Sequence, residues 1–223
     1  LEQACREEVR LNRRLAPHVY LDVVPIGSSG GQLRFGQGGR AIDWVVKMRR
    51  LPAARALDCL IKSRSIIDSA IERVAHLLSE FYFRLPPIAV KTKEYLEEIS
   101  HHVASNERDL LEPVHELDND QIKKIHEAQR RLLTLSPEKL QNRVVDGRIV
   151  EGHGDLRPEH IYLTGQPAII DCIEFNSEYR ILDVADELSF LEMECAELDA
   201  AWIGRHVLQT YCTRCGDAPP PQL

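Results

Sequence analysis

The chain has 223 residues, of which 43% are hydrophobic and 28% charged, a composition typical of a globular protein with a sizeable core. Its net charge of -7 provides no overall basic face, so duplex nucleic acid and anionic membranes are not expected as partners. No apolar run reaches membrane-spanning length, no signal peptide is recognisable, and the six cysteines are irregularly spaced. These features predict a cytoplasmic protein without a disulfide framework.

The N-terminal quarter predicts one helix followed by a β-hairpin. Residues 2–15 combine a few apolar positions with many charges, which is typical of an amphipathic helix that ends before Pro17. Residues 19–26 and 42–48 are rich in β-forming side chains, and a glycine-rich stretch from Gly27 to Gly39 connects them. No helix follows these glycines directly, so a hairpin turn is favoured over a phosphate-binding loop.

The middle of the chain is predicted to be helical and the last third mixed. Residues 52–142 show apolar stripes with charged outer faces, interrupted near Pro86 and Pro87. Short strands are predicted at residues 149–152, 160–163 and 168–175, and a further helix after Arg180. Cys212 and Cys215 form a lone C-x-x-C pair. Because a second ligand pair at proper spacing is missing, they are interpreted as structural or incidental cysteines and not as a zinc site.

The most informative segment is the stretch of residues 151–163 and the strand that follows it. It places Asp155 in a tight loop bounded by glycine and proline, and Asp171 partway along the next apolar strand. Two carboxylates on adjoining elements can face one pocket, where one orients a hydroxyl group and the other holds a metal ion. Phosphoryl transfer requires this combination, because positioning and charge neutralisation supply most of the catalysis.

These residues carry a resemblance to a known family. Residues 153–160 read H-G-D-L-R-P-E-H, which resembles the H-G-D-L-H-x-x-N catalytic loop of the aminoglycoside phosphotransferase and choline kinase-like family. They also resemble the H-R-D-x-K-P-x-N loop of protein kinases. The nearest resemblance is to an uncharacterised bacterial branch of that family, in which the segment at residues 44–52 is also familiar. The resemblance extends from the first helix to about Leu191.

The resemblance implies a two-lobed, protein-kinase-like α+β fold. A truncated, nucleotide-side small lobe with an antiparallel hairpin is expected at residues 1–51, and a mainly helical catalytic lobe at residues 52–223. The implied activity is transfer of the terminal phosphate of ATP or GTP to a hydroxyl group of a small molecule. The competing interpretation is a pseudokinase-like module that binds nucleotide or a partner without catalysis. A metal hydrolase using His153 and Asp155 is a third, weaker alternative. The acceptor and the oligomeric state stay open.

The same resemblance assigns roles on the catalytic side. Asp155 is expected to accept or orient the hydroxyl proton, and Arg157 to neutralise charge on the moving phosphoryl group. Asp171 is expected to hold Mg. His160 stands where the family has a metal-binding Asn, and imidazole suits Mn better than Mg, so His160 is either a metal ligand or a packing residue. His153 is expected to support the loop.

Further roles concern the nucleotide and the frame of the loop. Glu8, with Glu7 as second choice, is expected to pair with a phosphate-binding lysine that lies upstream of Leu1, since the chain begins without Met and is predicted to be part of a longer polypeptide. Val46, Lys47 and Met48 are expected to form a hinge that offers backbone groups to the adenine ring. Either Asp186 or Glu187 is expected to brace the catalytic loop, with Asp183 capping the helix.

Overall fold

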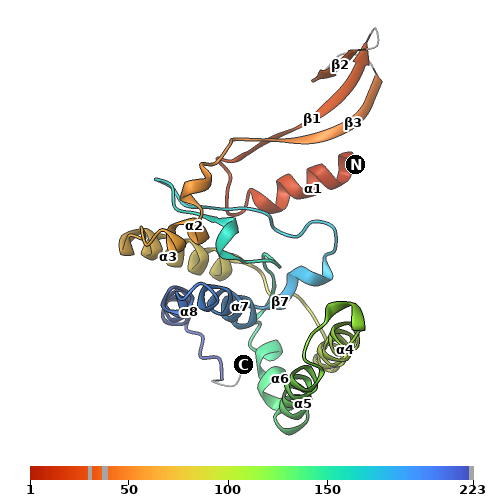
Figure 1. Ribbon diagram of the computed structural model, residues 1–223, viewed down its shortest axis with the longest axis vertical. Coiled ribbons are helices and arrows are strands. Elements are labelled where there is room, and N and C mark those ends of the chain that lie inside the picture. Colours follow the sequence, from red (N-terminus) through yellow and green to blue (C-terminus); the bar gives the residue numbers. More distant parts are fainter. Residues whose placement is uncertain (30–31, 37–39, 221–223) are drawn as a thin grey trace. The chain divides into compact units, whose positions relative to one another are not determined.

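The computed structural model describes residues 1–29, 32–36 and 40–220, and it is a mixture of helices with small antiparallel sheets. The α+β class expected from the sequence is therefore confirmed at this coarse level. The helices and strands, shown in Figure 1, are α1 (Glu2–Asn12), β1 (Tyr20–Ser29), β2 (Gln32–Phe35), β3 (Arg40–Met48), α2 (Leu57–Lys62), α3 (Asp68–Arg84), α4 (Thr92–Leu110), α5 (Asn119–Leu135), α6 (Pro137–Val145), β4 (Ile149–Glu151), β5 (Ile161–Tyr162), β6 (Ala168–Ile169), β7 (Ile181–Asp183), α7 (Val184–Ala196) and α8 (Ala201–Cys215).

The chain forms two compact units. The larger contains residues 1–86 and 150–223, and the smaller contains residues 87–149. The boundary between a small and a large lobe, expected after Leu51, falls inside the larger unit. The division into these two lobes stays a prediction. Among the described residues, no helix is both long enough and apolar enough to cross a membrane.

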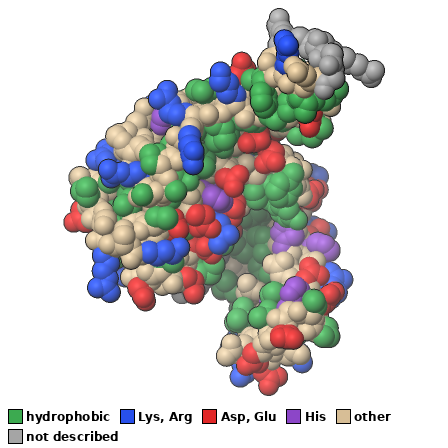
Figure 2. Space-filling model, turned by 45° about the horizontal axis from the view of Figure 1, so that its top comes forward, with side chains coloured by type: hydrophobic (Ala, Val, Ile, Leu, Met, Phe, Trp, Pro, Cys, Tyr) green, Lys and Arg blue, Asp and Glu red, His purple; other side chains and the backbone are tan. Residues whose placement is uncertain are grey.

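A three-stranded antiparallel sheet in the order β2-β1-β3 begins the larger unit. The two predicted strands pair with Val23 opposite Val46, and α1 lies against one face of the sheet (Figure 1). The predicted connection at residues 27–39 is shorter than expected, because β1 continues to Ser29 and residues 32–35 form β2. Residues 30–31 and 37–39 of that connection lie outside the described part. Hydrophobic side chains are visible on the sheet in Figure 2, and Phe35 of β2 is 77% exposed.

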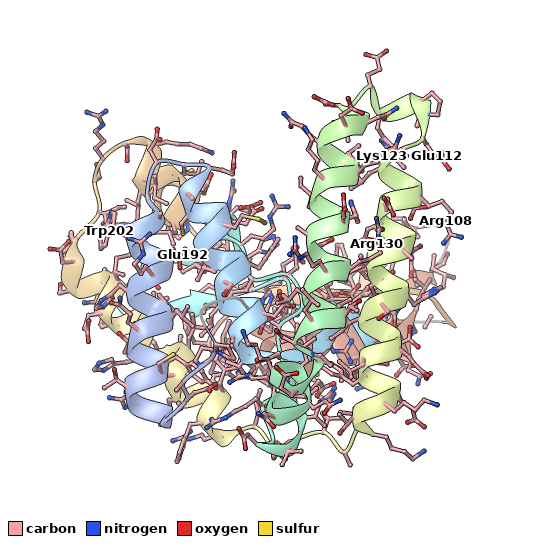
Figure 3. The ribbon with its side chains drawn as sticks, turned by 90° about the horizontal axis from the view of Figure 1, so that it is seen from below. Arg108, Glu112, Lys123, Arg130, Glu192 and Trp202 are labelled. Carbon is pink, nitrogen blue, oxygen red and sulfur yellow. The ribbon has the colours of Figure 1, made fainter. Side chains whose placement is uncertain are left out.

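The main hydrophobic core of the larger unit lies between α3, α7, α8 and the strands around the loop at residues 152–160. The apolar stripe predicted in the middle of the chain supplies Ile71, Val74 and Leu78, which are almost fully buried. Helices α7 and α8 lie side by side (Figures 1 and 3). A Cβ added at Gly204 of α8 would come within 2.2 Å of Cα of Glu192 in α7, so glycine is required at this crossing.

The smaller unit is built from α4, α5 and α6, and α4 and α5 form an antiparallel pair whose helices lie side by side in Figure 3. Arg130 of α5 forms an ion pair with Glu107 of α4. The Asp118 side chain accepts hydrogen bonds from the first backbone N–H groups of α5, which accounts for the start of that helix.

The six cysteines are free thiols, and Cys212 and Cys215 lie in the last turn of α8. The thiol of Cys215 donates a hydrogen bond to the carbonyl of Ser79 in α3. This contact gives Cys215 a packing role between the two helices.

Candidate active site

The loop between β4 and β5 carries Asp155, and a buried glutamate holds it from below. Both carboxylate oxygens of Glu187 in α7 accept a hydrogen bond from the backbone N–H of His153, at 2.9 and 3.1 Å, and one also accepts from Gly154. The hydroxyl of Tyr82 is a third donor to this carboxylate, at 2.5 Å. Burial raises the pKa of Glu187, and the hydrogen bonds oppose that rise.

Of the two residues expected to brace the loop, Glu187 makes the contact. Asp186 lies on the exposed side of α7, while Asp183 caps the helix by accepting a hydrogen bond from the N–H of Ala185. Gly154 adopts a φ of +89°, and a Cβ there would lie 2.9 Å from the carbonyl oxygen of Tyr179. Glycine is therefore needed where the loop passes close to the carbonyl of Tyr179.

His153 is built into the frame of the loop. Its side chain is 1% exposed, and Nε2 donates to the carbonyl of Ile170 at 2.9 Å. Its Nδ1 in turn accepts from the backbone N–H of Asp155 at 3.3 Å. Burial lowers the pKa of His153 to about 3, so the ring is neutral at pH 7. A buried neutral ring that bonds only backbone groups has the geometry of a support rather than of a proton carrier.

Asp171 follows β6 and leaves the strand in the left-handed region, with a φ of +68°. The strand predicted over residues 168–175 is therefore short, ending at Ile169. The backbone here is held from α1 and β1: the Asp171 N–H donates to the Tyr20 hydroxyl at 3.3 Å, and the Cys172 N–H donates to Oδ1 of Asn12 at 2.9 Å. The Asp171 side chain is left 68% exposed.

His160 lies between the two aspartates. Its Nδ1 donates to the backbone carbonyl of Asp155 at 2.9 Å and is 3.6 Å from the Asp155 carboxylate, while its Nε2 is 3.3 Å from the Asp171 carboxylate. Burial raises the pKa of Asp155; the charges of His160 and Arg157 lower it, and Asp171 raises it further. The fold thus brings together three of the predicted site residues.

The arrangement of His160 and Asp171 fits a divalent cation. Because Nδ1 of His160 is committed as a donor to a carbonyl, the Nε2 lone pair of a neutral ring faces the Asp171 carboxylate. Two acceptors 3.3 Å apart are suited to share a metal ion, and a histidine that binds a metal commonly donates its other ring N–H to a backbone carbonyl, as Nδ1 of His160 does here. The described residues contain no group of three or more metal-ligating side chains. Mg commonly takes only one or two carboxylates, with phosphate oxygens and water completing its shell.

Arg157 is engaged by acidic neighbours. Its Nη2 lies 3.0 Å from the carboxylate of Glu194 in α7, and its Nε lies 3.1 Å from Glu159. The side chain is 40% exposed. The role expected for Arg157, charge neutralisation on a phosphoryl group, requires the guanidinium to turn away from Glu194 or to share its donors.

On the nucleotide side, the structure distinguishes the two candidate glutamates of α1. Glu7 is paired with Arg10 and lies near Arg180. Glu8 is partly buried, and its pKa is raised by burial and then by the charges of Glu174 and Asp171. Within the described residues no cation pairs with Glu8, so it is the carboxylate that is open to a partner, as its predicted role requires.

The predicted hinge residues lie at the end of β3, which is an edge strand among the described residues. Val46 packs against a small apolar cluster together with Tyr162 of β5 and Ile170, the residue that precedes Asp171. Lys47 and Met48 are exposed. The hinge function of these three residues stays a prediction.

Several residues that hold the site were missed by sequence reasoning. Asn12 is 1% exposed and joins α1 to the segment after Asp171. Arg14 donates to the carbonyls of Glu151 and Gly152, both at 2.7 Å. Arg180 is 3% exposed and donates to the carbonyl of Ile173 at 2.8 Å and to Glu151 at 3.0 Å. Except for the bond from Arg180 to Ile173, these bonds join residues distant in the chain, so no local pattern could have indicated them.

Comparison with known proteins finds relatives but no family. The chain is 29% identical, over 235 aligned positions, to uncharacterized proteins from Mycobacterium bovis and from two strains of Mycobacterium tuberculosis. The match covers all of this chain and 44% of each relative, so the chain spans less than half the length of the relatives it matches. No family model and no solved structure matches the chain.

Proposed function

We propose that this chain forms the catalytic part of a small-molecule kinase, of the kind that the aminoglycoside phosphotransferase and choline kinase-like family represents, with a two-lobed kinase-like fold. The observation that carries the proposal is the convergence of Asp155 and Asp171 on the two ring nitrogens of His160. The braced loop around Asp155 supports it, because a residue that must orient a hydroxyl group requires a fixed backbone.

In the proposed reaction, the acceptor hydroxyl oxygen forms a bond to the terminal phosphorus of ATP or GTP, and the bond from that phosphorus to the bridging oxygen breaks. Asp155 accepts or orients the proton that the hydroxyl group loses, and its raised pKa favours proton acceptance. Asp171 and His160 would hold Mg or Mn, which supplies charge neutralisation at the phosphates. Arg157 would add positive charge on the acceptor side.

On the nucleotide side, Val46, Lys47 and Met48 would offer backbone groups to the adenine or guanine ring. Glu8 would pair with a lysine outside this chain, which would in turn bind the phosphates. The unpaired state of Glu8 among the described residues supports this assignment.

Calorimetry with the full-length protein tests the proposal. Mg–ATP and Mg–GTP are titrated into the wild type and into Asp171→Asn, with Glu178→Gln, an exposed carboxylate of the same unit, as control. We expect metal-dependent nucleotide binding to be lost in Asp171→Asn and retained in the control. Unchanged Mg–nucleotide affinity in Asp171→Asn would exclude Asp171 as the metal ligand.

The second candidate is a nucleotide- or partner-binding module without catalysis. The engagement of Arg157 by Glu194 favours it, since the guanidinium is not free for a phosphoryl group. Basal nucleotide hydrolysis separates the two candidates. The kinase proposal expects slow, metal-dependent hydrolysis that depends on Asp155, whereas a binding module binds nucleotide without turnover.

A further inference from the structure

A cavity lies in the larger unit, and none of its lining residues belongs to the candidate active site. It has a volume of about 320 Å³ and is formed by the segment after β3, the start of α3 and the turn between β5 and β6. Its volume is at the lower end of the range for small-molecule sites. The chemistry of its lining therefore indicates what it could bind.

Two arginines line this cavity, and none of its lining residues is acidic. Neither Arg55 nor Arg73 forms an ion pair with any residue that the structure describes, although the chain as a whole carries an excess of acidic residues. Arg157 and Arg180 of the same unit, by contrast, form ion pairs with glutamates. Two unpaired guanidinium groups on one concavity create a local positive potential that an anion would neutralise.

Hydrogen bonds hold the backbone of Arg55 and the side chain of Arg73. The Arg55 backbone is fixed by its N–H bond to Pro52 and by the bond that its carbonyl accepts from Leu163, both at 2.8 Å. The guanidinium of Arg73 is anchored through Nη1 to the carbonyl of Ser69, at 3.0 Å. The remaining N–H donors of each fork stay available. Because its guanidinium is already anchored, Arg73 loses less side-chain entropy on binding a ligand than a free arginine does.

The floor of the cavity is apolar. Leu60, Ala70 and Leu163 line it and are each less than one-tenth exposed, while Ile67 at the rim is 61% exposed. An apolar floor below cationic groups suits a ligand with a carbon skeleton at one end and an anionic group at the other. Inorganic anions would use only the second feature.

We propose that this cavity binds a small organic anion, in which a phosphate or carboxylate group meets Arg55 and Arg73 and the attached carbon skeleton packs on Leu60 and Leu163. This site is separate from the proposed phosphotransferase site and does not depend on it. The ligand is either a regulatory metabolite or the anionic end of a substrate. Both share the same chemistry.

Binding is measured by NMR titration of the amide signals of Thr164 and Gly165, which line the cavity. Phenyl phosphate, benzoate, inorganic phosphate and uncharged benzyl alcohol are titrated separately into the wild type. We expect saturable binding of one or both organic anions below about 10 mM, and weaker binding of inorganic phosphate and benzyl alcohol. The ratio of phenyl phosphate to benzoate affinity identifies which anionic group the site prefers.

The variants are Arg55→Gln and Arg73→Gln, with Arg131→Gln as a control that removes the same charge from an exposed position in the smaller unit. Losing one charged fork should weaken binding of the preferred anion about tenfold, and the control should leave it unchanged. Asp171→Asn should also leave it unchanged, because the two sites are separate. The proposal is overturned if no anion saturates the signals, if benzyl alcohol binds equally well, or if Arg55→Gln and Arg73→Gln behave like the control.

Discussion

The two aspartates of the candidate site are held in different ways. Asp155 sits on a loop whose backbone is bonded from below by the buried Glu187, and its own side chain is 36% exposed. Asp171 has its backbone fixed by Asn12 and Tyr20, yet its side chain is 68% exposed and lies near Glu8. The backbone of the loop that carries Asp155 is held by hydrogen bonds from residues of this chain. Around Asp171, by contrast, the carboxylates of Glu8 and Glu174 add negative charge. We infer that, in the proposed function, the surroundings of Asp155 are preorganised for an acceptor and those of Asp171 bind cations.

The largest effect is expected from the charge of Asp155. In the full-length protein, Asp155→Asn should lower phosphotransfer or basal nucleotide hydrolysis on the order of a hundred- to ten-thousand-fold, because a general base or orienting group is lost. Nucleotide affinity should stay nearly unchanged, since in the proposed reaction Asp155 acts on the acceptor and not on the nucleotide. Turnover assays and calorimetry on the same samples measure both. Intact turnover would remove Asp155 from the mechanism and favour the binding module.

The brace below the loop gives the next largest effect. Glu187→Ala leaves the N–H groups of His153 and Gly154 and the hydroxyl of Tyr82 without their buried acceptor. At roughly 1–3 kcal/mol for each unsatisfied group, the free energy of unfolding should fall by at least about 3 kcal/mol. Asp186→Ala on the exposed side of α7 should cost less than about 1 kcal/mol. Urea denaturation measures both, and equal losses would show that Glu187 does not brace the loop.

His153 makes the stability of the loop side depend on pH. Its pKa is about 3 in the folded protein and near 6.5 in the unfolded chain, so between these values the unfolded state binds one more proton. The stabilisation is therefore complete above about pH 6.5 and is lost as the pH falls toward 3. Between pH 7 and pH 5 the wild type should lose about 2 kcal/mol from this group alone.

The variant His153→Asn isolates this contribution. Asparagine cannot be protonated, so the difference in unfolding free energy between the wild type and the variant should shrink by about 2 kcal/mol on going from pH 7 to pH 5. Denaturation at both pH values measures it. A difference that does not change with pH would show that the ring is charged, or exposed, in the native protein.

Most of the helices and strands could be predicted from the sequence, because periodicity and turn residues are local signals. The stripe with Ile71 and Leu78 and the pairing of β1 with β3 followed from them. The end of β6 did not, since the strand pattern continues past Ile169 while the chain turns at Asp171 to meet Asn12 and Tyr20. That turn depends on contacts with α1, about 160 residues earlier in the chain.

The candidate site shows the same division. Asp155, His160 and Asp171 stood out because short motifs carry them, and the fold brings them together. Whether Asp186 or Glu187 braces the loop depended on which face of α7 is buried, which spacing alone left open. Arg14 and Arg180 were missed because they bond to backbone carbonyls, which leave no mark in the sequence, and to Glu151, which is distant in the chain.

The smallest effect is expected at His160, where the two sides of the site meet. If its Nε2 is a metal ligand beside Asp171, Mn should support nucleotide binding better than Mg, because imidazole is a softer ligand than the oxygen donors that Mg prefers. His160→Asn supplies an amide oxygen instead, so the ratio of Mn to Mg affinity should fall by a few fold. Calorimetry with both metals measures the ratio. Glu178→Gln serves as the control and should keep the wild-type ratio. Identical ratios in His160→Asn and the wild type would leave His160 as a packing residue that only holds the carbonyl of Asp155, and Asp171 would then act without it.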